Sequence, residues 1–188
     1  MQLRFLVLTS SLFLAFCVAP AYAADTTSRT GQTKESTSAE VRAFLTQAAG
    51  AGAYEVEVSK MAAEKATQPD VRKYAQMLVQ HHTAVNDELK TLASLKALAL
   101  AADLSPDLKA KYVSLQNMAG QTFDIAYLQN VGIDDHEKDI KLFERAARSA
   151  DDAEVRAFAT KTLPTLNRHL STAKELTKQR KSERSSLR

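Results

Sequence analysis

Apolar residues recur at helical spacing in four separate stretches of the chain. In the first stretch, alternating steps of four and three residues place one stripe of residues on one helix face. Its members are Val41, Leu45, Ala48, Gly52, Glu55, Ser59, Ala62 and Ala66. Similar stripes run from Val71 to Leu92, from Leu128 to Ala147 and from Val155 to Leu176. No alternating strand pattern competes with them, so the sequence predicts an all-α fold.

Turn and capping residues mark where these helices begin. Pro69 suits the first position of the second helix, a Ser-Pro pair at 105–106 opens the third, and Asp151 has the spacing of a cap for the fourth. The third helical stretch would be unusually long if it were unbroken, so we expect a break near Gly120. Together these features predict a ferritin-like, up-down-up-down four-helix bundle over residues 38–177.

Each apolar stripe carries one ionisable residue: Glu55, His82, His136 or His169. The first two lie at equal distances from the predicted first turn, and the last two at nearly equal distances from the predicted last turn. In an up-down-up-down bundle both turns lie at the same end. At about 1.5 Å rise per residue, the first pair is roughly 20 Å from that end and the second roughly 25 Å. The four side chains are therefore expected to meet in the interior.

A buried cluster of this kind favours a metal ion. One carboxylate cannot satisfy three imidazoles, whereas imidazole nitrogens and a carboxylate oxygen together suit a divalent Zn, Cu, Fe or Mn ion. Two alternatives stay open. The Glu/His network could be a hydrogen-bonded polar core that only fixes helix packing, in a structural or interaction protein, or it could line a water-filled ligand pocket. His81 lies about 100° from its stripe, and we expect it at the edge.

The sequence favours a binding protein over an enzyme. No serine or threonine has an evident base and orienting partner, so nucleophilic hydrolysis is unsupported. The remaining enzymatic hypothesis is a redox enzyme, which would require an iron or copper ion with an open coordination position.

The N-terminal segment has the features of a cleaved secretory signal. Arg4 is followed by an apolar run from Phe5 to Val18 and then by Ala21-Tyr22-Ala23. We therefore predict a signal peptide over residues 1–23, no transmembrane segment after its removal, and a periplasmic or envelope-associated protein. Cys17, the only cysteine, falls inside this segment, so the mature protein has no thiol ligand. Residues 24–37 are polar and are expected to form a flexible leader.

Basic charge is concentrated at the C-terminus. Residues 178–188 contain five basic residues and one acidic residue, against a net charge of +3 for the whole chain. We expect this tail to be disordered. The body of the chain has no basic face with interleaved aromatic residues, which argues against nucleic-acid binding.

Several segments in order resemble a bacterial family, the domain of unknown function numbered 4142. They are Glu55-Val56-Glu57, Val71-Arg72-Lys73-Tyr74-Ala75, His81-His82, Phe123-Asp124-Ile125-Ala126-Tyr127, Asp135-His136-Glu137 and Leu163-Pro164-Thr165-Leu166-Asn167-Arg168-His169-Leu170. The resemblance covers roughly residues 39–176. It implies a ferritin-like four-helix bundle, exported to the cell envelope, with no established activity.

Two departures limit what the resemblance implies for the site. The family usually has Asp-His where this chain has His81-His82, so a carboxylate that could orient His82 is absent at that position. Neither His82 nor His169 has a glutamate three residues before it, because Val79 and Leu166 stand there. The sequence therefore does not predict the di-iron centre found in other ferritin-like proteins.

Overall fold

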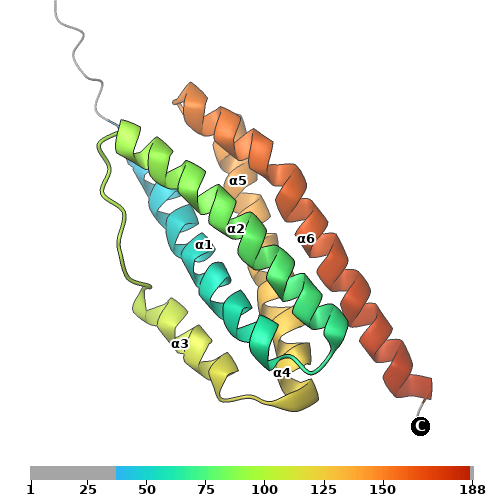
Figure 1. Cartoon of the computed structure of the whole chain (residues 1–188). Helices are drawn as coiled ribbons and strands as arrows, with labels where there is room; N and C mark the ends of the chain where they lie inside the picture. The colour runs from blue at the N-terminus through green and yellow to red at the C-terminus, as the bar shows by residue number, and fades with distance from the viewer. Residues whose placement is uncertain (1–36, 187–188) are drawn as a thin grey trace, which may run out of the picture. The chain divides into compact units, whose positions relative to one another are not determined.

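The computed structural model describes residues 37–186, and every regular element in that range is helical (Figure 1). The predicted signal peptide and nearly all of the predicted leader lie outside the described residues. Four long segments form the bundle, the third of them a continuous run of three elements, and one short helix lies on a connection. The elements are α1 (Ala39–Lys65), α2 (Pro69–Leu95), α3 (Pro106–Gln116), α4 (Gly120–Tyr127), the π-helix η1 (Leu128–Asp135), α5 (His136–Ser149) and α6 (Ala153–Ser186). This architecture confirms the predicted all-α bundle.

The direction of the third long segment differs from the predicted strict alternation. Ser38, at the start of α1, hydrogen-bonds Asp151 in the last turn at 3.0 Å, whereas Thr67 in the first turn hydrogen-bonds Asp124 at 2.6 Å. The two turns therefore lie at opposite ends of the bundle. Residues 96–119 carry the chain back along its length, so α5 runs parallel to α2 (Figure 1). The up-down-up-down order is thus corrected to a bundle with one long crossover, which is the ferritin-like arrangement.

The predicted break near Gly120 is present. The Oγ atom of Ser105 accepts a hydrogen bond from the Leu108 amide and caps α3, which ends at Gln116. Gly120 then begins α4 with a φ of 60°. Glycine reaches this left-handed conformation without steric cost, so the chain can change direction between α3 and α4.

The start of α6 is one residue later than the sequence predicted. Asp152, rather than Asp151, caps this helix, because its carboxylate accepts hydrogen bonds from the amides of Glu154 and Val155 at 3.0 Å each. Asp151 instead binds Ser38 of α1.

The apolar interior is divided into two parts. One cluster lies near the first turn and is built around Tyr54, Tyr74 and Tyr127, and the other lies near the last turn and is built around Phe44 and Phe143. The four predicted polar residues fall between these clusters on all four long segments. The bundle therefore has a polar layer enclosed by apolar packing on both sides.

The π-helix η1 leads directly into His136 and was not predicted. Such wide turns are uncommon and often occur at functional sites. Within η1, a Cβ atom added at Gly132 would lie 2.7 Å from the Ala173 Cβ and 3.2 Å from the Tyr74 hydroxyl. The absence of a side chain at Gly132 therefore lets the backbone of η1 approach α6 closely.

Helix α6 continues through most of the segment for which we expected disorder. It ends at Ser186, and Arg180 within it is only 9% exposed and pairs with Asp70 at the start of α2. This ion pair attaches the basic end of α6 to the bundle, which the sequence pattern did not indicate.

Replacing Gly132 by alanine should destabilise the protein. The new methyl group would overlap Ala173 on a packed helix, and such overpacking costs about 1–3 kcal/mol. Gly50 is the matched control, because a Cβ there meets only Leu108, at an ordinary 3.7 Å. Gly50→Ala should be neutral or stabilising by up to about 1 kcal/mol, since alanine favours helix. Urea denaturation of both variants measures the two free energies of unfolding, and equal values would refute the close approach.

Candidate metal centre

Four helical segments each bring one side chain to the polar layer. Glu55 comes from α1, His82 from α2, His136 from the first position of α5 and His169 from α6. Their exposed fractions are 1%, 3%, 0% and 0% respectively. The structure thus brings together all four residues that the sequence predicted to meet, although the two turns used to align them lie at opposite ends. All four residues nevertheless meet, because each lies near the middle of its long helical segment, and these segments are about 40–50 Å long.

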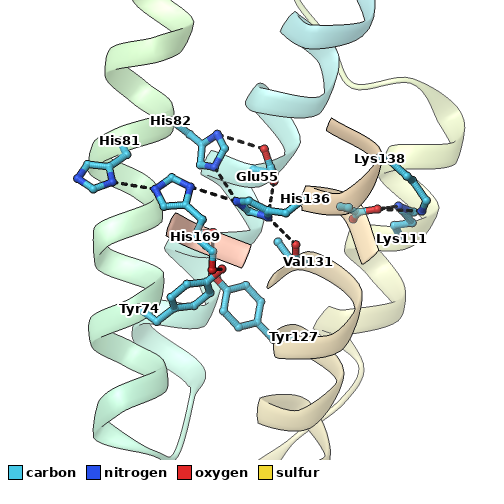
Figure 2. Close-up of polar contacts among 12 residues, drawn as sticks. Glu55, Tyr74, His81, His82, Lys111, Tyr127, Val131, His136, Lys138 and His169 are labelled. Carbon is cyan, nitrogen blue, oxygen red and sulfur yellow. Dashed lines mark hydrogen bonds and ion pairs between the residues drawn. The ribbon is translucent and has the colours of Figure 1, made fainter. Parts of the chain in front are cut away.

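Three imidazole nitrogens converge on one point (Figure 2). His82 Nε2 lies 3.4 Å from His136 Nε2, which lies 3.1 Å from His169 Nδ1. One ring nitrogen from each of the three histidines lies within 4.8 Å of the others. A tetrahedral zinc ion with Zn–N bonds of about 2.0–2.1 Å separates its nitrogen ligands by about 3.3–3.4 Å. The two shorter separations are close to that value.

A hydrogen bond on the outer side of the His136 ring fixes which of its nitrogens carries the proton. His136 Nδ1 donates to the carbonyl oxygen of Val131, five residues earlier in η1, at 2.9 Å. Its Nε2 atom therefore directs a lone pair into the centre. His82 Nδ1 faces the Oε2 atom of Glu55 at 3.1 Å, and in the tautomer with the proton on this Nδ1 atom the Nε2 atom of His82 also directs a lone pair into the centre.

Glu55 lies behind the histidines rather than beside the convergent nitrogens. Its Oε1 atom is 3.2 Å from His136 Nδ1 and its Oε2 atom is 3.1 Å from His82 Nδ1, so it approaches the outer nitrogens. These contacts are short but poorly aligned, and neither oxygen has a hydrogen-bond partner of good geometry. The sequence grouped Glu55 with the three histidines as a fourth ligand, whereas the geometry gives it the position of a carboxylate that orients two of them.

His81 also contacts the cluster, although the sequence placed it at the edge. Its Nδ1 atom lies 2.8 Å from His169 Nε2, and the two rings are nearly parallel. All four histidines of the chain therefore belong to one hydrogen-bonded group. His81 is half-buried and occupies the outer position that links His169 to the surface (Figure 2). Its 100° offset from the stripe indicated an edge position but not this contact.

Burial keeps the histidines neutral. It lowers the pKa of His82 to about 3 and that of His169 to about 2, and it also lowers the pKa of His136 and of His81. Neutral imidazole is the form that binds a metal ion. Burial has the opposite effect on acids. It raises the pKa of Glu55 well above its usual value, with further contributions from Asp139 and Asp135, and raises that of Asp139 to about 6.

Neighbouring polar residues have defined structural roles. Asp135 pairs with Lys111 of α3 at 2.5 Å and with Lys138 at 3.2 Å, which ties α3 to the bundle. The Tyr74 hydroxyl donates to the backbone carbonyl of His169 at 3.2 Å and so supports that turn of α6. The sequence analysis identified neither Tyr74 nor Asp139 as a neighbour of the site. The pattern around Tyr74 is typical of an aromatic core residue, and the pattern around Asp139 is typical of a surface residue.

The family is shown by a match that covers most of the molecule. The family model described as "Domain of unknown function (DUF4142)" matches residues 26–176. The chain belongs to this family. The match begins after the predicted signal peptide and includes the whole polar layer, and it confirms the resemblance seen in the sequence. No curated protein matches the chain.

Two solved structures share the fold at low sequence identity. A DUF305 fragment from Deinococcus radiodurans is 12% identical with a TM-score of 0.67, and the match covers 76% of this chain and 98% of that one. A DUF305 protein of Streptomyces coelicolor that is inferred to be secreted is 16% identical with a TM-score of 0.65, covering 76% of this chain and 92% of that one. At these identities the likeness establishes the helical bundle alone.

Replacing Glu55 by glutamine should make the metal-free protein less sensitive to rising pH. The folded pKa of Glu55 lies above its usual 4.5, so the folded state holds a proton that the unfolded state releases. Stability is therefore lost as pH rises above the unfolded pKa, by at most about 1.4 kcal/mol per pH unit, and Glu55→Gln removes that loss.

Urea denaturation between pH 5 and pH 8 measures this effect in chelator-treated protein. Glu57→Gln, on the exposed face of the same helix, is the control. The advantage of Glu55→Gln over the wild type should grow with pH. An advantage that is constant across this range would show that Glu55 is ionised in the folded protein.

Proposed function

We propose that this protein is an exported helical-bundle protein that binds one divalent transition metal ion through His82, His136 and His169. Glu55 orients the His82 and His136 rings, and His81 orients His169. The proposal is supported above all by the convergence of three buried imidazole nitrogens, with His136 Nε2 lying 3.4 Å from His82 Nε2 and 3.1 Å from His169 Nδ1.

Proton accounting favours a metal over a purely hydrogen-bonded core. His136 carries its proton on the outer nitrogen, so its Nε2 atom offers a single lone pair to the centre. His82 Nε2 and His169 Nδ1 lie 3.4 Å and 3.1 Å from that atom, and its lone pair can accept a well-aligned hydrogen bond from only one of them. The other inward nitrogen then lacks a partner in the layer. A buried acceptor without a donor costs about 1–3 kcal/mol. A cation at the centre accepts all three lone pairs and removes that cost.

The donor set narrows the class of ion. Three imidazole nitrogens suit Zn, Cu or Fe, whereas Mg, Ca and Mn favour oxygen ligands. Three protein ligands leave a fourth position for water or an exogenous ligand, as in sites where the metal acts on a bound molecule.

Two observations support export. The first residues have a basic start, an apolar run and a small-residue ending, and the family match begins at residue 26, just beyond them. A protein of the same fold is inferred to be secreted. Among the described helices, none has the length and apolar character to cross a membrane. A periplasmic or envelope location gives the protein access to metal ions outside the cytoplasm.

Metal binding should raise thermal stability, because the site exists only in the folded state. An ion present at a hundred times its dissociation constant adds about 2.7 kcal/mol, which is about 5–11 °C in melting temperature for a protein of this size. Scanning calorimetry of untagged, chelator-treated protein with and without added Zn²⁺ or Cu²⁺ measures the shift. An unchanged melting temperature with every candidate ion would refute the proposal.

Substitution of a ligand separates the metal site from a structural polar core. His169→Ala should abolish stoichiometric binding in isothermal titration while the bundle still melts cooperatively. His81→Ala, the matched control, should retain one-to-one binding with an affinity about 10-fold lower, because it removes only an orienting partner. If neither the wild-type protein nor the His169→Ala variant binds metal, and the substitution only lowers stability, then the polar layer serves only to fix helix packing. Equal losses of binding in both variants would mean that the inward face is assigned wrongly.

A further inference from the structure

A second buried carboxyl group stands next to Glu55. Asp139 is 8% exposed and lies three residues after His136 on α5, so both face the same side of that helix. A negative charge on Asp139 raises the pKa of Glu55, which is the sign of two carboxyl groups in the same part of the interior. The site therefore has two acids behind its imidazoles, and they come from two helices that contact each other, α1 and α5.

Among the described residues, no lysine or arginine forms an ion pair with either of these two acids. Among the described residues, the short ion contacts of Glu55 are with His82 and His136 alone, and Asp139 is in no ion pair. The nearest lysines, Lys111 and Lys138, both pair with Asp135 instead. Both Glu55 oxygens are buried without an aligned hydrogen bond. Two ionised carboxylates in this position would thus bring two negative charges into the interior without a lysine or arginine in direct contact with either.

We propose that Glu55 and Asp139 together supply the charge that balances a divalent ion on the three imidazoles, and so make the centre selective for divalent over monovalent cations. The inference rests on the proposed metal site and names the charge class of its ion. Asp139 acts through Glu55 and the histidines as a positioning and charge-balancing residue, without touching the ion.

The selectivity follows from electrostatics. Three neutral imidazoles bring no charge, so an ion they bind in the interior depends on nearby anions for compensation. The Coulomb energy scales with the product of the charges. Each carboxylate therefore stabilises a divalent ion by twice the free energy that it gives a monovalent ion at the same place. A nearby cation also favours the ionised form of both carboxyl groups.

Asp139→Asn, with Zn²⁺ and Ag⁺ as probes, tests this inference. The variant is nearly isosteric and removes one negative charge. Glu137→Gln is the matched control, because it removes the same charge from the same helix at a half-buried position that pairs with Lys174. Asp139→Glu keeps the negative charge and should therefore keep the wild-type preference for Zn²⁺ over Ag⁺. Competition titrations give the dissociation constants of the two ions for each protein.

The expected changes differ between the two ions. Loss of an outer partner costs about 10–100-fold in metal affinity, so Zn²⁺ binding to Asp139→Asn should weaken by that factor. The free energy of Ag⁺ binding should change by half as much, because Ag⁺ carries half the charge. Ag⁺ binding should therefore weaken by the square root of the Zn²⁺ factor, about 3–10-fold. The Zn²⁺ to Ag⁺ affinity ratio thus falls about 3–10-fold. For bound copper, the same ratio corresponds to a Cu²⁺/Cu⁺ midpoint potential about 30–60 mV higher.

Four results overturn the inference. Equal weakening of Zn²⁺ and Ag⁺ binding, with an unchanged copper potential, would show that Asp139 only supports the fold. An equal change of ratio in Glu137→Gln would show a general effect of net charge. An unchanged Zn²⁺ to Ag⁺ affinity ratio in Asp139→Asn, while His169→Ala still abolishes binding, would refute the charge balance but not the metal site. A wild-type protein that binds neither ion would refute both.

Discussion

The burial of three imidazoles and a carboxyl group between two apolar clusters is the constraint on which the rest of the structure depends. Each of these groups loses its hydration, and burial is the largest cause that shifts the pKa of His82 and His169 down and that of Glu55 up. The resulting neutral rings can offer lone pairs, but they cannot satisfy one another without a further cation or proton. The apolar packing on both sides holds the four helices at the distance where the rings meet.

The backbone around His136 shows how the fold serves this layer. The π-helix η1 brings the Val131 carbonyl to the outer nitrogen of His136, five residues later, and so directs the other nitrogen inward. Gly132 permits η1 to approach α6, which supplies His169, and Tyr74 supports the His169 turn from α2. An irregular helix, a glycine and a buried hydroxyl thus position two ligands from adjacent segments.

Much of this arrangement could be predicted from the sequence, because helical periodicity reports which residues face inward. Glu55, His82, His136 and His169 were identified as one layer even though the chain direction was predicted wrongly, since a residue near mid-helix stays near mid-bundle in either topology. The crossover could not be read from periodicity, which carries no direction. The π-helix has no spacing signal, and the contacts of His81 and Asp139 depend on ring and carboxyl orientations that only packing decides.

X-ray absorption at the metal edge tests the central claim most directly, using untagged protein isolated from the cell envelope and its His136→Ala variant. We expect one divalent ion per chain, with three imidazole nitrogens at about 2.0–2.1 Å if the ion is zinc, and loss of that signal in the variant. A protein without stoichiometric metal, or one whose ion has an oxygen-only shell that His136→Ala leaves unchanged, would contradict it.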